Sequence, residues 1–197
     1  MNIHCLALNY AGVGELVQDP LYFLKSTSCL SKNNGVVPYP KYKTEQVWTE
    51  VELGILIGKS CENVDEDCAE DYIKGFFVAA DLTTKNIHGR DHHLAFSKAR
   101  TGFCPIGDDV VDLDLSEKHL EMKTYINGNL SQSGSTQDMI YNPYKSVSYI
   151  SKLVRINEGD IILTGTPSGA ENNLIQPNDE IVHTIENIGE LKYRMGI

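Results

Sequence analysis

The stretch VWTEVELGILIG, residues 47–58, decides the fold of this chain. Its apolar side chains recur at every second position, which is the period of a β-strand with one face against a core. These side chains belong to Val51, Leu53, Ile55 and Ile57. Glu50 and Glu52 also lie two residues apart, so their carboxylates share the other face of the strand. The sequence therefore predicts one strong strand that carries two neighbouring acidic groups.

A second apolar run follows an acidic segment. Residues 65–74 (DEDCAEDYIK) predict a helix, with Asp65 as its N-cap and Gly75 directly after its end. The run FFVAAD, residues 76–81, then predicts a buried strand that ends in the carboxylate of Asp81. Because a carboxylate in an apolar setting is costly without a partner, Asp81 marks a candidate functional position.

Weaker signals place the rest of the chain. We expect short strands at 3–8 and 22–25, a loop at 32–40, a hairpin about Asn127-Gly128, a helix within 138–153, a strand and turn at 160–169, and a last hairpin around 187–189. Strands outnumber helices in this order. The sequence therefore predicts a strand-dominated α+β fold with an antiparallel sheet system.

The composition is that of one ordinary globular domain, which we expect to span residues 1–197. This length is enough for one real core and too short for two large domains. With 41% hydrophobic and 22% charged residues, extensive disorder is excluded. The longest apolar run, ILIG at 55–58, has the length of a strand, so we expect no membrane partner. The first twelve residues show no basic start and no sustained apolar stretch, so we expect no secretory signal.

Charge and cysteine content narrow the partners and the compartment. The formal net charge of −10 would repel phosphate backbones, so we expect no nucleic-acid partner. Five cysteines, an odd number without any C-x-x-C pair, are typical of reduced thiols rather than of a disulfide framework. We therefore expect a reducing compartment and a cytoplasmic location.

Glu50, Glu52 and Asp81 form a candidate metal site. Two adjacent acids on an inward strand face are tolerable only if they are solvated, protonated or bridged by a cation. Alone, the glutamate pair also fits an edge strand with a solvated acidic face. Asp81 as a third acid favours a hard ion bound through oxygen, and Mg²⁺, Mn²⁺ or Ca²⁺ fit this donor set where structural zinc does not.

Basic side chains are dense in residues 82–102. A lysine near a metal, such as Lys98, binds a carboxylate or acts as a base, although a surface lysine fits the sequence as well. His88, His92 and His93 with Arg90 predict an anion-binding or proton-transfer loop, or else a few unrelated surface groups.

Two segments are similar to ligand-binding turns, but the second lacks the required spacing. Thr164-Gly165-Thr166-Pro167 follows an apolar strand, so it predicts either a plain tight turn or a hydroxyl and N–H groups suited to a substrate carboxylate. The segment GILIGKS is similar to a phosphate-binding loop, but only three residues separate Gly54 from Gly58 where four are required.

Six segments, taken in order, resemble the fumarylacetoacetate hydrolase family. They are EVELGILIGK (50–59), GFFVAAD (75–81), SKARTGFCPIGD (97–108), INGNLSQSGSTQDMIY (126–141), GDIILTGTPSGA (159–170) and IENIGEL (185–191). The resemblance implies a strand-dominated mixed β-sandwich roll of the family's C-terminal domain type, a Mg²⁺ or Mn²⁺ ion, and a homodimer. It also implies small 2-oxo acid substrates, which are hydrolysed, decarboxylated or shifted between their enol and keto forms.

By position, the resemblance implies roles for single residues. It makes Glu50, Glu52 and Asp81 the metal ligands and Lys98 the active-site lysine. Thr166, with Gly165, would hold the substrate carboxylate, and Lys25 belongs to the segment Phe23-Leu24-Lys25 near the site. Lys85 and His88 stand where an Arg and a Gln are common in the family, so Lys85 is a candidate for substrate binding and His88 for catalysis.

The N-terminal lid departs from the family. In NYAGVGEL, residues 9–16, Val13 and Leu16 replace the His and Glu of hydrolytic members, and residues 1–45 form a reduced lid segment. Either Glu15 or one of His88, His92 and His93 supplies the base, or hydrolysis is not the main reaction.

We therefore expect a divalent-metal-dependent enzyme that acts on a small 2-oxo acid through an enolate. The family default is C–C hydrolysis of acylpyruvate-type substrates. One alternative is a decarboxylase or keto–enol tautomerase of a 2-oxo diacid such as oxaloacetate. A further alternative is a catalytically silent protein that binds a metal or an organic acid.

Overall fold

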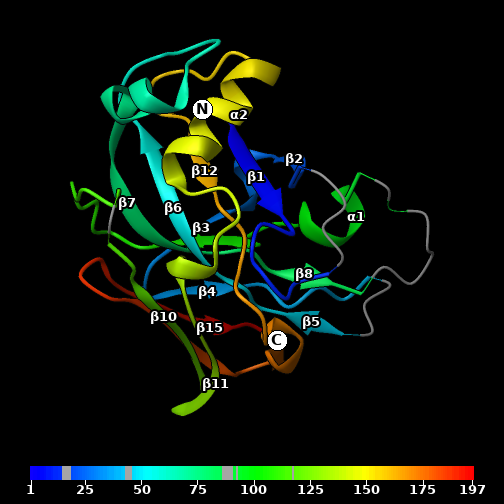
Figure 1. Cartoon of the computed structure of the whole chain (residues 1–197). Coiled ribbons are helices and arrows are strands. Elements are labelled where there is room, and N and C mark those ends of the chain that lie inside the picture. The colour runs from blue at the N-terminus through cyan, green and yellow to red at the C-terminus, as the bar shows by residue number, and fades with distance from the viewer. Residues whose placement is uncertain (15–18, 43–45, 86–90, 92, 117) are drawn as a thin grey trace.

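The computed structural model describes residues 1–14, 19–42, 46–85, 91, 93–116 and 118–197. The larger of its sheets has seven strands in the order β2-β1-β12-β6-β7-β9-β3 (Figure 1). Their bounds in this order are Leu21–Lys25, Ile3–Ala7, Ile161–Leu163, Val51–Ile57, Ile73–Ala80, Cys104–Ile106 and Leu30–Lys32. β1 pairs in parallel with β12, and β6 pairs antiparallel with both β12 and β7. Strand β6, which carries Glu52 and begins directly after Glu50, therefore lies at the centre of this sheet.

A second sheet packs against the first one. Its five strands have the order β11-β10-β14-β15-β4. Their bounds in this order are Asn129–Ser135, Glu121–Ile126, Glu180–Ile185, Gly189–Met195 and Gly35–Val37. Strands β10 and β14 contact β6, and β14 and β15 contact β7, so the central strands of the first sheet are covered by the second.

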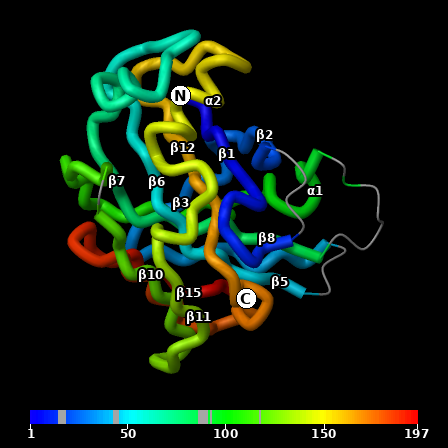
Figure 2. Tube along the Cα trace, viewed as in Figure 1, coloured from blue at the N-terminus to red at the C-terminus, as the bar shows by residue number. Residues whose placement is uncertain are grey.

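A small third sheet and several short helices complete the fold. The small sheet has the order β13-β5-β8, with bounds Leu174–Ile175, Val47–Trp48 and Thr83–Thr84. The α-helices are α1 (Ala95–Lys98) and α2 (Pro143–Leu153), and the 3₁₀ helices are η1 (Thr27–Cys29), η2 (Glu66–Tyr72), η3 (Thr136–Asp138) and η4 (Ala170–Asn172). Helix α2 packs on η2 at one end of the larger sheet, and α1 lies beside β8 (Figure 2).

Both faces of β6 are buried. Val51 and Leu53 belong to the main core cluster between the sheets, together with Val78 of β7. On the opposite face Gly54 lies beside Phe77, and an added Cβ at Gly54 would come within 2.4 Å of the phenyl ring. A large side chain on β7 thus takes the space that the glycine leaves free. Glu52 is consequently buried, whereas Glu50, the residue before β6, keeps a side chain that is 20% exposed.

The predicted strand at 47–58 is interrupted, which corrects the expectation of one continuous strand. Residues 47–48 form β5 and pair with β13 and β8, whereas β6 begins at Val51 and pairs with β12 and β7. At the junction, the N–H of Thr49 donates to the carbonyl of Asn173 at 3.2 Å. The chain therefore passes from one sheet to another at Thr49 and Glu50.

The predicted helix at 65–74 is also wrong in type and length. The segment forms the 3₁₀ helix η2, and β7 already begins at Ile73, which lies opposite Ile57 of β6. Gly75 is a residue of β7 and not a helix end. An added Cβ on Gly75 would lie 2.8 Å from the carbonyl oxygen of Val111, so close backbone approach explains this glycine. Strand pairing with β6 overrides the local helical pattern.

The predicted loop at 32–40 contains regular structure. Lys32 ends β3, which pairs in parallel with β9, and Gly35–Val37 form β4, which pairs in parallel with β15. Both strands are three residues long and pair with distant segments. Such short strands leave no periodic pattern in the sequence.

The remaining elements are confirmed. The strands at 3–8 and 22–25, the two hairpins and the strand before the 164–167 turn appear as β1, β2, β10–β11, β14–β15 and β12. The helix within 138–153 begins at Pro143, where the side chain of Asn142 accepts a hydrogen bond from the N–H of Lys145 at 2.8 Å. All five cysteines lie in the described part and are free thiols, as expected. No helix in the described part of the chain has the length and apolarity of a membrane span.

Candidate metal and substrate site

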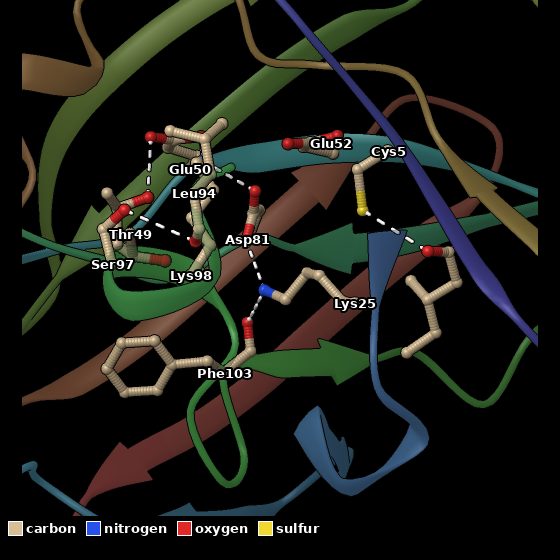
Figure 3. A network of polar contacts seen from close by, with 12 residues as sticks. Cys5, Lys25, Thr49, Glu50, Glu52, Asp81, Leu94, Ser97, Lys98 and Phe103 are labelled. Carbon is tan, nitrogen blue, oxygen red and sulfur yellow. Dashed lines mark hydrogen bonds and ion pairs between the residues drawn. The ribbon is translucent and has the colours of Figure 1, made fainter. Parts of the chain in front are cut away.

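Three carboxylates converge where β6 begins and β7 ends. Glu50, Glu52 and Asp81 each offer an oxygen, and these oxygens lie within 4.8 Å of one another (Figure 3). The antiparallel register explains the convergence, because Val51 lies opposite Ala80 and the residues just beyond this pair are Glu50 and Asp81. The N–H of Asp81 also donates to the carbonyl of Glu50 at 3.0 Å. The sequence-predicted acid triad is therefore one cluster in space.

Two buried lysines hold Asp81. Lys98, at the end of α1, donates to Asp81 Oδ2 at 2.6 Å and to Glu50 Oε2 at 2.9 Å. Lys25, at the end of β2, donates to Asp81 Oδ1 and to the carbonyl of Phe103. Lys25 and Lys98 are 4% and 6% exposed, so solvent does little to weaken these ion pairs. Both carboxylate oxygens of Asp81 are thus fixed in place (Figure 3).

The electrostatics of the cluster divide its acids into two kinds. Burial raises the pKa of Glu52 well above its ordinary value, and the charges of Asp81 and Glu50 add to this effect. Burial also acts to raise the pKa of Asp81, but Lys25 and Lys98 outweigh it and hold that pKa below its usual range. Asp81 is therefore a permanent anion, whereas Glu52 is a carboxylate that lacks sufficient positive charge nearby.

Lys98 is a cation in this arrangement. Burial alone would lower its pKa, but the negative charges of Asp81, Glu50 and Glu52 raise it above the ordinary lysine value. An ammonium group with a raised pKa donates hydrogen bonds and stabilises negative charge, and it does not remove protons. Lys98 therefore makes the carboxylate contacts that one of the sequence hypotheses expected, and its burial excludes the alternative of a surface lysine.

The donor set fits a divalent cation. Among the described residues, the ion pairs of the cluster involve Glu50 and Asp81 but not Glu52, which accepts a hydrogen bond from the N–H of Gly165 at 2.6 Å. With all groups ionised, three carboxylates and two ammonium groups leave one net negative charge in a buried site. A divalent ion would change the net charge of the site from −1 to about +1, which suits an anionic ligand. Three carboxylate oxygens are the donors that Mg²⁺, Mn²⁺ and Ca²⁺ prefer.

The 164–167 turn lies against the acid cluster. Gly165 has φ +87°, a conformation open to glycine, and an added Cβ would meet the carbonyl oxygen of Leu6 at 3.1 Å. This conformation aims its N–H at Glu52. The next residue, Thr166, is 9% exposed, and its hydroxyl accepts a hydrogen bond from Gln132 at 3.1 Å.

The structure thus brings most of the sequence-predicted residues together. Those in the cluster or its adjoining turn are Lys25, Glu50, Glu52, Asp81, Lys98, Gly165 and Thr166. Lys85 lies just after β8 with its side chain exposed, and its N–H donates to the carbonyl of Gln46 at 3.1 Å. The candidate bases Glu15 and His88, with Arg90 and His92, lie outside the described residues. His93 is exposed and lines a cavity of about 450 Å³ with Leu21–Leu24 and Leu94–Ala95.

Sequence reasoning missed three supporting residues. Thr83 donates to Glu50 Oε1 at 3.1 Å, and the carboxylate of Asp91 accepts from the N–H groups of Phe96 and Ser97 in α1, the helix that ends in Lys98. An acid shortly before a helix is a recognisable signal, so Asp91 could have been identified. Gln132 contacts Thr166 across 34 residues of sequence, and no local pattern reveals that contact.

The comparisons with known proteins show the family to which the chain belongs. The family model described as fumarylacetoacetate (FAA) hydrolase C-terminal matches residues 2–195. The chain belongs to the fumarylacetoacetate hydrolase family. An uncharacterized protein of Methanocaldococcus jannaschii is 34% identical over 96% of this chain and 81% of its own length. An uncharacterized protein of Staphylococcus epidermidis is 38% identical over 88% of this chain, and the match spans 60% of that relative.

Solved structures show the family fold. The crystal structure of a 5-carboxymethyl-2-hydroxymuconate delta-isomerase from Mycobacterium smegmatis has a TM-score of 0.89 and 30% identity, over 99% of this chain and 76% of that one. A fumarylpyruvate hydrolase from Pseudomonas aeruginosa, crystallised with Mn²⁺ and pyruvate, has a TM-score of 0.90 at 23% identity, over 100% of this chain and 90% of that one. The expected fold class, a strand-dominated α+β fold of the C-terminal domain type of fumarylacetoacetate hydrolases, is confirmed.

Proposed function

We propose that this chain is a divalent-metal-dependent enzyme that acts on a small 2-oxo acid through an enolate. The observation that carries the proposal is the position of Lys98, whose buried ammonium group contacts both Asp81 and Glu50 of the acid triad. A cation at this place supports a negative charge that develops beside the carboxylates. A silent binding protein has no evident use for such a group, and so we favour an enzyme.

Glu50, Glu52 and Asp81 would hold the ion. A divalent ion in such a site supplies a Lewis acid that stabilises the enolate formed when a bond to the carbon next to a 2-oxo group breaks. Lys25 keeps Asp81 ionised and oriented, and Thr83 orients Glu50. Mg²⁺ and Mn²⁺ are the ions that we propose, with Ca²⁺ as a further candidate from the oxygen donor set.

Lys98 and the 164–167 turn would contact different parts of the substrate. Lys98 stabilises the enolate oxygen by a charge-assisted hydrogen bond or returns a proton to the enolate. Thr166, in the turn fixed against Glu52 by Gly165, presents a hydroxyl group suited to the substrate carboxylate. The net positive charge of the loaded site would attract the 2-oxo acid anion, because opposite charges interact strongly where water is excluded.

The family default reaction is C–C hydrolysis of an acylpyruvate. A second candidate is keto–enol tautomerisation or decarboxylation of a 2-oxo diacid such as oxaloacetate. The observation that favours it concerns the N-terminal lid. Val13 and Leu16 stand where hydrolytic members carry a His and a Glu, and neither side chain can take a proton from water. The 30% identity to the M. smegmatis isomerase is consistent with this alternative.

The assembly and the compartment complete the proposal. We propose a homodimer in the cytoplasm, with a small-molecule 2-oxo acid as substrate and neither nucleic acid nor membrane as partner. Light scattering coupled to gel filtration tests the dimer, and a mass near twice 21.9 kDa supports it.

A substrate screen tests the function. Acylpyruvates of increasing size and oxaloacetate are incubated with the protein and Mg²⁺ or Mn²⁺, with and without a chelator, and the products are identified by NMR. Metal-dependent conversion of at least one 2-oxo acid at a rate above that with the metal ion alone supports the proposal. Conversion that a chelator leaves unchanged, or no conversion of any member of the panel, contradicts it. The product distinguishes hydrolysis from decarboxylation and tautomerisation.

A further inference from the structure

Gln132 lies deep in the molecule and reaches the candidate substrate turn. It belongs to β11, where the pairing with β10 shifts so that Thr124 lies opposite Gln132 and Tyr125 opposite Leu130. Ser131 is thus an extra residue in the strand, which is a β-bulge, and bulges re-aim the side chains beside them. Gln132 is 3% exposed as a result.

The carboxamide of Gln132 bonds at both ends. Its Nε2 donates to the carbonyl of Pro167 at 2.7 Å and to Thr166 Oγ1 at 3.1 Å, with a longer contact of 3.4 Å to the carbonyl of Ser168. Its Oε1 accepts from Asn173 Nδ2 at 2.7 Å and from Thr124 Oγ1 at 3.2 Å.

The hydrogen-bond partners of Gln132 identify the oxygen and the nitrogen of its carboxamide. Asn173 Nδ2 also donates to the carbonyl of Thr49 at 3.0 Å, and a carbonyl only accepts, so this atom is a nitrogen. Gln132 must then turn its oxygen toward Asn173. The carbonyl of Pro167 demands a nitrogen at the other end, and the two requirements agree.

This orientation determines what the hydroxyl of Thr166 can do. An amide nitrogen donates and does not accept, so Thr166 Oγ1 is the acceptor in the contact with Gln132. The hydrogen of the Thr166 hydroxyl is therefore left for another group. A hydroxyl that accepts in this way can still donate its own hydrogen, and it prefers a ligand with an accepting, negatively charged end.

The contact also acts on the turn as a whole. Gly134, two residues after Gln132, has no room for a side chain, since a Cβ would lie 2.4 Å from Pro167 Cβ. Strand β11 therefore packs directly on the turn, and Gln132 bonds the same turn from the same strand. The turn is in contact with the metal triad at its other end, through the N–H of Gly165 and Glu52.

We propose that Gln132 is a positioning residue that makes Thr166 a hydrogen-bond donor and so selects substrates with a free carboxylate. This inference rests on the proposed function, because it assigns the carboxylate of the 2-oxo acid to Thr166. Gln132 itself touches no reacting atom. It acts on the substrate only by donating a hydrogen bond to Thr166, which leaves the Thr166 hydroxyl to donate its own.

The test compares two ligands that differ in one charge. Binding of pyruvate and of methyl pyruvate is measured by calorimetry in the presence of Mg²⁺ for wild type, Gln132→Met, Thr166→Val and the double variant. Methionine has nearly the length of glutamine but no donor. Loss of a hydrogen bond to a charged group costs roughly a factor of ten or more in affinity. We expect Gln132→Met to weaken pyruvate binding about tenfold and methyl pyruvate binding about twofold or less.

The double variant separates a positioning role from a separate contact. If Gln132 acts through Thr166, adding Gln132→Met to Thr166→Val leaves the affinity for pyruvate at the level of Thr166→Val alone, because the hydrogen bond is already lost. Additive losses would overturn the inference. Mg²⁺ affinity of Gln132→Met should equal that of wild type. A parallel loss of Mg²⁺ affinity would show that Gln132 only supports the turn against Glu52, which also overturns the inference.

A second variant guards against a folding failure. In Gln132→Glu the carboxylate accepts instead of donating, so the Thr166 hydroxyl turns toward it and the preference for pyruvate falls as well. Wild-type protein that prefers pyruvate, with an unchanged preference in the Gln132 variants, overturns this inference alone. Wild-type protein that binds neither ligand and converts no 2-oxo acid overturns the proposed function and this inference with it.

Discussion

Lys98 and Asp81 form an ion pair in the interior, with the ammonium nitrogen 2.6 Å from Asp81 Oδ2. The pair joins the last residue of α1 to the end of β7. Since Lys98 also contacts Glu50, the lysine and the metal candidate use the same two carboxylates. Metal binding and the charge on Lys98 are therefore coupled.

Asp81→Asn should abolish tight binding of the divalent ion. The variant removes the acid that two lysines keep ionised, and it leaves both ammonium groups beside the metal position. We expect Mn²⁺ affinity, measured by calorimetry, to fall by at least about a hundredfold, since the lost charge and the new repulsion act together. The exposed Asp67→Asn is the matched control and should bind as wild type. Equal metal content in wild type and Asp81→Asn would disprove the ligand assignment.

Lys98→Ala should lower kcat far more than it raises KM. A contact made mainly with the developing enolate is absent in the ground state, so its loss appears in kcat. We expect a drop of roughly a hundredfold or more in kcat, the usual scale for one electrostatic group at an oxyanion. Steady-state kinetics on the best substrate of the screen gives both constants. A near-native kcat would mean that Lys98 has a structural or substrate-binding role only.

Stability should fall with acid because of His183. This residue is fully buried, and burial lowers its pKa to about 3, while Thr49 and Thr124 bond its two ring nitrogens. The unfolded chain takes up the proton near pH 6.5, so His183 favours folding fully above that pH, and the benefit is lost as pH falls toward 3. Between pH 7.5 and pH 5 this contributes a loss of about 2 kcal/mol.

Urea unfolding at the two pH values measures this effect. The titratable neighbour of His183 is Tyr193, whose pKa burial raises above its ordinary value, so it stays neutral throughout the range. His183→Gln should show a difference between the two pH values smaller by about 2 kcal/mol, and the exposed His119→Gln should keep the wild-type difference. Identical pH dependence in wild type and His183→Gln would refute the prediction.

Gly54→Ala should destabilise the fold while leaving Glu50, Glu52 and Asp81 unchanged. The new methyl group would lie 2.4 Å from the ring of Phe77, in the centre of the larger sheet. Overpacking of this kind costs about 1–3 kcal/mol. The matched variant Gly128→Ala has open space around its Cβ but a φ of +77°, so its smaller cost reports backbone strain alone. Equal stability of Gly54→Ala and wild type in urea would show that β6 and β7 can separate here.

Hydrolysis of acylpyruvates should be weak relative to tautomerisation or decarboxylation of oxaloacetate. Val13 and Leu16 cannot take a proton, so a protein base for water must come from Glu15 or from His88, His92 or His93. Rates for both substrates are compared in wild type, Glu15→Gln and the three His→Ala variants. Fast acylpyruvate hydrolysis that none of these variants reduces would contradict this expectation.

Local sequence patterns predicted much of the fold and of the candidate metal site. The alternation from Val51 to Ile57, the buried run that ends at Asp81 and the Asn127-Gly128 turn each act within a few residues, so sequence alone reveals them. Glu50, Glu52 and Asp81 could be grouped from the sequence because three carboxylates suit one hard ion and because the family resemblance matches them. The antiparallel pairing of β6 with β7, which brings them together, came from the structure.

What sequence could not reveal depends on distant contacts. The break at Thr49 follows from a bond to Asn173, and the end of η2 follows from the pairing of Ile73 with Ile57. The contact of Gln132 with Thr166 depends on a bulge and on the packing of β11 against the turn. Nothing in the local sequence encodes which remote segment supplies the partner.

The most direct test of an enolate-forming metal enzyme is hydrogen exchange at the carbon next to the 2-oxo group. Pyruvate, 2-oxobutyrate and 2-oxoglutarate are incubated in D₂O with the protein and Mg²⁺, and loss of the C3 proton signal is followed by NMR. We expect exchange above the protein-free rate for at least one of these acids, abolished by a chelator and strongly reduced in Lys98→Ala. A protein that binds Mg²⁺ at Glu50, Glu52 and Asp81 but exchanges none of them faster than Mg²⁺ alone would contradict the proposal of an enolate-forming metal enzyme.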